Sequence, residues 1–71
     1  MKLKINGEEK IIFPIEKKPN LWVVIKELEL NPKLIVLEFN GAILNPEMWG
    51  DQIVQDGDIL EIVTIVGGGS C

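Results

Sequence analysis

The sequence contains no histidine and only one cysteine among its 71 residues. Protein zinc sites are built mainly from histidine nitrogens and cysteine sulfurs, so a zinc site of the usual kind cannot be assembled from this chain. The one cysteine, Cys71, has no second cysteine with which to form an internal disulfide bond. We therefore expect neither a metal site nor an internal disulfide.

Long apolar runs are also missing. No stretch approaches the roughly 18 uninterrupted apolar residues that a membrane-spanning helix needs. The first segment, MKLKINGEEK, alternates between polar and apolar side chains, and Glu8 and Glu9 lie where a secretory signal would have its apolar core. We therefore expect a soluble, cytoplasmic protein without an export signal.

The sequence has fewer basic residues than acidic residues. The chain has 7 lysines and arginines against 11 aspartates and glutamates, which gives a net charge of −4. Nucleic acids and anionic membranes attract clustered lysine and arginine, so we expect neither as a partner. A partner protein with a basic surface suits this charge better.

What the sequence does contain is typical of a small globular domain. Hydrophobic residues make up 46% of the chain and charged residues 25%. A chain of this length forms a single domain that buries about 60% of the surface of the unfolded chain. Such a domain has little room for an enclosed active site.

The N-terminal half predicts a hairpin followed by a helix. Asn6 and Gly7 separate a strand around residues 3–5 from a second strand at about residues 10–15, and this pair of residues is typical of a tight hairpin turn. Asn20 is a suitable helix N-cap, and apolar residues follow it at helical spacing. Asn31 and Pro32 are expected to end this helix after about three turns.

The C-terminal half predicts three more strands. Residues 33–39 form one strand, the Asn40-Gly41 turn leads to a short strand at residues 42–44, and NPEMWGDQ forms an irregular or single-turn connection. We expect Trp49 and Met48 to fold back from this connection onto the core. The last strand is DILEIVTIV, which follows a turn at QDGD.

The order of these elements predicts an α+β fold of the β-grasp, ubiquitin-like type. It has a mixed sheet of four to five strands with one main helix packed on one face. In the last strand, Leu60, Ile62 and Thr64 are expected to face one side, while Glu61, Val63 and Ile65 face the other. The expected core joins the helix residues Leu21, Val24, Ile25 and Leu28 to the sheet residues Leu3, Ile5, Val36, Leu60 and Ile62.

Other candidate functional residues have simpler structural interpretations. Asp56 and Asp58 flank a turn glycine and have no histidine beside them, so we interpret them as turn residues and not as a catalytic pair. Trp22 and Trp49 lack interleaved basic residues, which favours packing over nucleic-acid stacking. No catalytic residue is predicted.

The run NPEMWGDQIVQDGDILEIVTIVGGG resembles the ThiS family of sulfur carrier proteins in thiamin biosynthesis. The resemblance lies in the order of a tryptophan-containing connection, a D-G-D turn, an apolar last strand and a glycine-rich end. It implies a carrier whose C-terminal glycine carboxylate is adenylated by a partner and converted to a thiocarboxylate, which supplies sulfur to the thiazole ring. The related MoaD carriers use similar chemistry.

This resemblance also implies the partners and the site. The partners are a ThiF-type adenylating enzyme that uses ATP, a desulfurase or sulfurtransferase as sulfur donor, and thiazole synthase. The carrier itself binds no cofactor and is not an enzyme. A β-grasp domain at residues 1–66 precedes a flexible glycine-rich tail at residues 67–71, and Gly67 and Gly68 lead to the reactive carboxylate of Gly69.

Ser70 and Cys71 depart from the family pattern, because they mask the carboxylate of Gly69 with a peptide bond. Either a protease removes them or they are not native to the protein; as a third alternative, Cys71 carries sulfur as a persulfide. Glu61, Val63 and Ile65, on the outward face beside the tail, are the predicted docking residues. Alternative functions are a MoaD-like or other sulfur-transfer carrier, and a ubiquitin-like interaction module whose tail does no chemistry.

Overall fold

The computed structural model describes residues 1–65. The predicted tail at residues 67–71 lies outside the described residues, so the predicted domain boundary stays a prediction. The described part of the chain contains these elements: β1 (Lys2–Ile5), β2 (Glu8–Ile11), α1 (Leu21–Glu27), the 3-10 helix η1 (Pro32–Leu34), β3 (Ile35–Phe39), β4 (Ala42–Leu44), α2 (Pro46–Trp49) and β5 (Ile59–Thr64).

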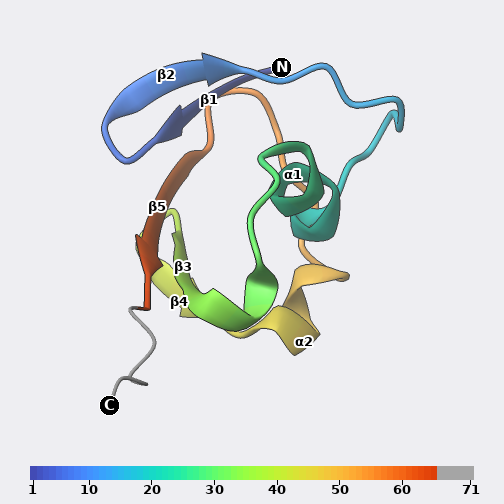
Figure 1. The fold of residues 1–71 in the computed structure, drawn as a ribbon. Coiled ribbons are helices and arrows are strands. Elements are labelled where there is room, and N and C mark those ends of the chain that lie inside the picture. Colours follow the sequence, from blue (N-terminus) through green and yellow to red (C-terminus); the bar gives the residue numbers. More distant parts are fainter. Residues whose placement is uncertain (66–71) are drawn as a thin grey trace.

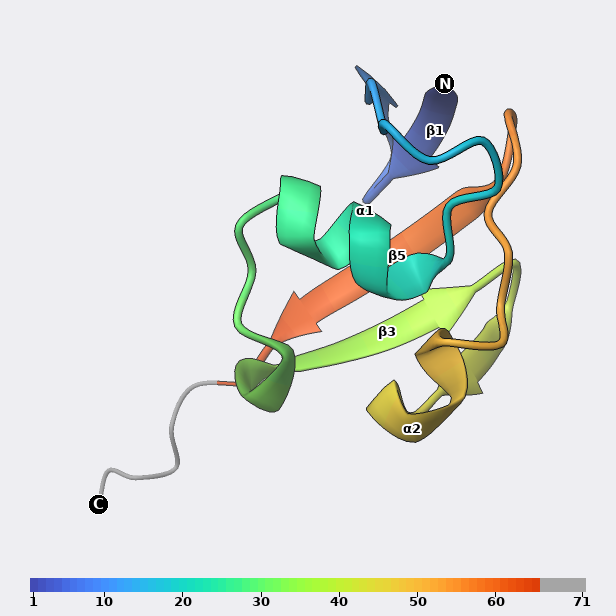
Figure 2. The ribbon, with the colours of Figure 1, turned by 90° about the vertical axis from the view of Figure 1, so that its right-hand side faces the viewer.

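The strands of this region form one mixed sheet in the order β2-β1-β5-β3-β4. β1 and β5 run parallel, and the other neighbouring pairs run antiparallel. The helix α1 crosses one face of the sheet (Figure 1, Figure 2). The predicted α+β fold of β-grasp type is therefore confirmed, with five strands and one main helix.

Both predicted Asn-Gly turns are present. Asn6 and Gly7 have φ angles of 52° and 83°, and Asn40 and Gly41 have φ angles of 49° and 92°. A two-residue hairpin turn of this kind needs positive φ at both central positions, which asparagine and glycine tolerate best. These turns connect β1 to β2 and β3 to β4.

β2 lies closer to the turn than predicted, because it begins at Glu8 and not near Lys10, and it ends at Ile11 and not near Ile15. The ladder with β1 continues only as far as Ile12, whose N–H and C=O both bond to Met1 at 2.8 Å. In this register Met1 lies opposite Ile12, so no residue before β1 is left to pair with Phe13 or Pro14. The chain also bends from Ile15 onward. Strand pairing therefore stops before the end of the apolar run.

The helix α1 begins as predicted. Asn20 has an extended backbone conformation, and its side-chain oxygen accepts a hydrogen bond of 3.1 Å from the N–H of Val23. The helix ends at Glu27, earlier than the predicted end, and Glu29 then has a left-handed φ of 57°. Asn31 and the following proline cap and begin η1 instead of ending α1.

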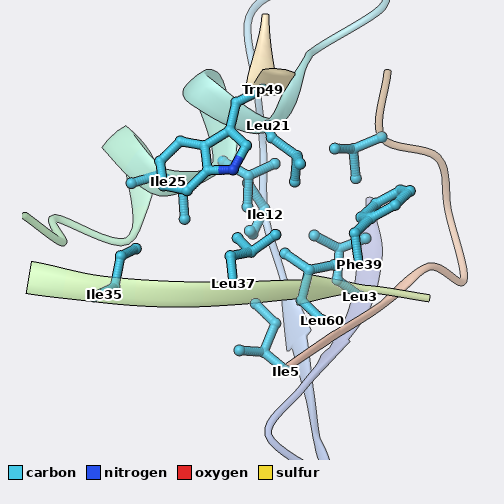
Figure 3. Close-up of a cluster of buried hydrophobic side chains, with 12 residues drawn as sticks. Leu3, Ile5, Ile12, Leu21, Ile25, Ile35, Leu37, Phe39, Trp49 and Leu60 are labelled. Carbon is cyan, nitrogen blue, oxygen red and sulfur yellow. The ribbon is translucent and has the colours of Figure 1, made fainter. Parts of the chain in front are cut away.

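The core lies between α1 and the sheet, where Figure 3 shows its side chains converging. The prediction for Val36 is wrong, because this residue is 41% exposed. Pairing of β3 with β5 places Leu37 opposite Ile62, so Leu37 faces the helix and Val36 faces away from it. The buried apolar residues are Leu3, Ile5, Ile12, Leu21, Val24, Ile25, Ile35, Leu37, Phe39, Trp49, Val54 and Leu60.

The connection containing α2 places one large side chain in this core. Trp49 is fully buried, as predicted, and its Nε1 donates a hydrogen bond of 2.9 Å to the carbonyl of Leu44. Trp22 packs on it edge to face, with ring centroids 4.9 Å apart, and stays 40% exposed. The prediction for Met48 is wrong, because its side chain is 52% exposed.

Candidate functional site

β5 is the middle strand of the sheet and leads toward the predicted tail. Its last residue, Thr64, pairs with Ile35 at the start of β3. The next residue, Ile65, donates its N–H to the carbonyl of Leu34 at 2.6 Å. The chain is therefore held to the sheet up to the last described residue, and the glycine run begins shortly after this anchored point.

The side chains of β5 alternate as the sequence predicts. Leu60 is fully buried and Ile62 is half-buried under α1. Glu61 and Val63 point to the face that α1 does not cover, and Val63 is 63% exposed. Ile65 is 46% exposed just beyond the strand. The three predicted docking residues are thus all exposed, and none of them belongs to the core.

Val63 has apolar neighbours that the sequence alone did not assign to it. Val36 on β3 lies directly opposite Val63, and Ile43 on β4 lies opposite the next outward residue of β3, Glu38. Val36, Ile43 and Val63 are 41%, 66% and 63% exposed. We call these three residues the outer-face cluster; together with two glutamates they line a shallow depression.

The two glutamates beside the outer-face cluster are Glu38 and Glu61. They are paired directly across β3 and β5. Like charges directly opposite each other on neighbouring strands destabilise the pair by a fraction of a kcal/mol up to about 1 kcal/mol. A lysine or arginine from a partner would relieve this repulsion. The outer face therefore offers apolar contact area and an acidic pair at the same place.

Asparagine side chains hold β5 in position, a role that the sequence analysis missed. The Asn6 side chain accepts from the N–H of Ile62 at 2.7 Å and donates to its carbonyl at 3.1 Å. At the start of β5, Asn40 accepts from the N–H of Ile59 at 2.9 Å. Both residues also make the turns, and only their positive φ angles were predicted. Their side chains extend the pairing of β5 where β1 and β3 end.

The acidic turn before β5 has a structural role, as predicted. Asp56 accepts a hydrogen bond from the N–H of Lys2. Asp58 accepts from the N–H of Gln55 at 2.7 Å and from the Asn40 side chain at 3.1 Å. Both carboxylates accept hydrogen bonds from backbone N–H groups, which agrees with their interpretation as turn residues.

Residues 1–65 contain no group of three or more histidine, cysteine, aspartate or glutamate side chains arranged to hold a metal ion. In the same residues, no helix is both long enough and apolar enough to span a membrane. The predicted reactive residue Gly69 and its neighbours Gly67, Gly68, Ser70 and Cys71 lie outside the described residues. Their roles stay predictions.

Known proteins resemble this chain along nearly its whole length. Residues 3–69 match the model of the ThiS family. A protein from Trieres chinensis, described as uncharacterized protein ycf40, is 38% identical over 65 residues, which are 92% of this chain and 85% of that protein. The crystal structure of a thiamine biosynthesis protein (ThiS) from Geobacter metallireducens superposes with a TM-score of 0.80 at 27% sequence identity, covering 97% of this chain and 100% of that chain.

One similar protein is much longer than this chain. A thiazole synthase from Paramagnetospirillum magneticum is 36% identical over 70 residues, which are 99% of this chain and 21% of that protein. This chain therefore resembles one segment of a larger polypeptide that carries the name of a thiazole-forming enzyme.

Proposed function

This chain belongs to the ThiS family of sulfur carriers in thiamine biosynthesis, and we propose that a partner enzyme adenylates its C-terminal glycine, which then becomes a thiocarboxylate. The chain is a protein co-substrate in this scheme, and the catalytic groups belong to its partners. The observation that carries the proposal is the course of β5, whose anchored end at Ile65 is followed by Val66 and three glycines.

The chemistry needs only a free terminal carboxylate on the carrier. A carboxylate oxygen of Gly69 attacks the α-phosphorus of ATP, and pyrophosphate leaves. The acyl-adenylate is then attacked at its carbonyl carbon by a sulfide equivalent, and AMP leaves. The product is a thiocarboxylate in which one sulfur has replaced one oxygen. Holding the adenylate inside the partner protects it from water.

The glycine run fits this chemistry for a steric reason. A backbone without Cβ atoms can enter a narrow channel and approach a nucleotide more closely than other residues can. The match to the ThiS family extends through Gly69 and leaves Ser70 and Cys71 outside, which supports Gly69 as the reactive end. Ser70 and Cys71 must be removed first, because the carboxyl group of Gly69 forms a peptide bond with Ser70 while they are present.

We assign docking of a ThiF-type adenylating enzyme to the outer-face cluster. Val63 and its neighbours supply exposed apolar area next to the anchored end of β5. Glu38 and Glu61 supply two carboxylates that suit basic residues on the enzyme, in agreement with the net charge of −4. Docking at this face fixes the position of the domain while the glycine run reaches the ATP site.

Two further partners complete the scheme in the cytoplasm. A desulfurase or sulfurtransferase supplies the sulfur, and thiazole synthase receives it. The similarity of this chain to a segment of the Paramagnetospirillum thiazole synthase supports the second partner, because joining two functions in one polypeptide keeps the donor close to the acceptor. The carrier needs no bound cofactor of its own.

Pyrophosphate release tests this proposal. The chain truncated after Gly69 should release pyrophosphate when it is incubated with a ThiF-type enzyme and ATP, and the full chain should not. The matched control is the same truncated chain with a C-terminal carboxamide, which has no carboxylate and should be inert. Equal pyrophosphate release by the full chain and the truncated chain would contradict the assignment to Gly69.

A further inference from the structure

The segment after β2 exposes large apolar side chains at the edge of the sheet. Ile11, Phe13 and Ile15 are 62%, 79% and 95% exposed. They alternate with Ile12, which is buried in the core. Figure 1 shows the chain continuing past the end of β2 before it turns back toward α1. β2 is an outermost strand of the sheet, so this segment borders a free edge.

The backbone of this edge has unpaired groups on its outer side. Ile12 exchanges both of its backbone hydrogen bonds with Met1. In an antiparallel pair, successive residues of a strand point their N–H and C=O groups to opposite sides. Glu9, Ile11 and Phe13 therefore direct theirs away from β1. Exposed edges of this kind pair readily with another strand.

The sequence of the segment is complementary to itself when it is read in the opposite direction. It reads EEKIIFPIEKK from Glu8 to Lys18. If two copies run antiparallel with Phe13 opposite Phe13, every charged residue faces an opposite charge. The facing pairs are Glu8 with Lys18, Glu9 with Lys17, and Lys10 with Glu16, while Ile11 faces Ile15.

We propose that the chain around Phe13 pairs antiparallel with the same segment of a second copy of this chain, about a two-fold axis at Phe13, and that the charged residues of Glu8–Lys18 flank this pairing. Ile11 and Phe13 point their backbone N–H and C=O groups outward. In this register these groups form hydrogen bonds with the second copy. Pro14 has no N–H, but it occupies an alternate position that faces away from the partner. The proline therefore removes no hydrogen bond from the dimer.

The shape of the segment limits the size of this interface. The chain bends at residues 15–18, so the backbone ladder is confined to the region around Phe13. The flanking lysines reach the opposite glutamates through their long side chains. Such an interface buries much less surface area than a standard stable complex does. We therefore expect a weak, reversible dimer that dissociates on dilution.

The dimer leaves the proposed docking site free. β2 and β4 lie at opposite ends of the strand order, and the outer-face cluster is formed by β3, β4 and β5. Each copy in the dimer therefore presents its own outer-face cluster. Dimerisation through this edge does not depend on whether Gly69 is adenylated.

Sedimentation equilibrium of two charge-swap variants tests the register directly. One variant is E8K/E9K and the other is K17E/K18E, and all four side chains are exposed. The wild-type chain should dimerise as its concentration rises toward about 1 mM. Each variant alone should dimerise at least about tenfold more weakly, because like charges now face each other.

An equimolar mixture of the two variants should restore dimerisation, because lysines of one variant then face glutamates of the other on both sides of the axis. Thermal unfolding of each variant checks that the fold is intact. A wild-type chain that stays monomeric at about 1 mM would overturn the proposal. A mixture that associates no better than its components would overturn it as well, since nonspecific contact of apolar side chains does not depend on the charge pairing.

Discussion

Replacing Val63 with aspartate tests the orientation of β5 and the role of the outer-face cluster in one variant. Val63 is 63% exposed, so about a third of its side chain is covered. Full burial of a valine contributes about 1.5–3 kcal/mol, and losing a third of it costs roughly 1 kcal/mol or less. The new carboxylate also lies near Glu38 and Glu61, which adds about 0.2–1 kcal/mol.

The expected loss of stability for V63D is therefore about 1–2 kcal/mol, or roughly 5–15 °C in Tm for a domain of this size. Circular dichroism during heating measures this shift. The matched control is Leu60→Asp, the same change at a fully buried position three residues earlier on the inner face of β5. Burial of an unpaired carboxylate costs several kcal/mol, so L60D should not fold stably.

Binding to the adenylating enzyme supplies the second readout. Loss of an apolar anchor at an interface weakens binding by about tenfold or more, so Kd for V63D should rise by at least that factor while the domain stays folded. Isothermal titration calorimetry measures this change. An unfolded V63D would show that Val63 faces the core, which requires a one-residue shift in register. A folded V63D that binds with unchanged Kd would refute the docking role.

Three other substitutions test separate parts of the structure. Trp49→Phe removes the hydrogen-bond donor to the Leu44 carbonyl and leaves a void, so urea denaturation should show a free energy of unfolding lower by about 2–4 kcal/mol. An unchanged free energy of unfolding would show that neither this hydrogen bond nor the packing of the indole stabilises the fold. Asn6→Gly keeps the positive φ but removes two hydrogen bonds to Ile62, which should lower the free energy of unfolding by about 1–2 kcal/mol. An unchanged Tm would show that the Asn6 side chain does not stabilise β5. Gly68→Leu, made in the chain ending at Gly69, should leave Tm unchanged and abolish pyrophosphate release, whereas a large fall in Tm would show that Gly68 is structural.

Local patterns in the sequence were sufficient to predict the hairpins and the orientation of β5. Asn6 and Gly7 occur together because a tight turn requires positive φ, and this requirement is visible in two adjacent residues. In β5, buried Leu60 and half-buried Ile62 alternate with charged and exposed residues, so the inner face could be assigned without a partner strand. Both predictions depend on residues that are neighbours in the sequence and need no contact between distant residues.

The inner face of β3 could not be predicted from the sequence, because it depends on a contact between distant residues. β3 contains Ile35, Val36 and Leu37 in a row, so no alternation identifies the inner face, and only the pairing of Leu37 with Ile62 does so. The same pairing brings Val36 to Val63 and completes the outer-face cluster. The sequence predicts the end of α1 at Asn31 and Pro32. The helix instead ends before Glu29, which has a left-handed φ of 57°, and a glutamate does not predict this conformation as a glycine would.

The intact mass of the protein isolated from its native cells tests the central claim most directly. The account predicts a chain that ends at Gly69, with a fraction of the molecules heavier by the difference between one sulfur and one oxygen. Fragmentation of this species should place the added sulfur on Gly69. A protein that retains Ser70 and Cys71 in every molecule, with sulfur on the Cys71 thiol and none on Gly69, would contradict the account.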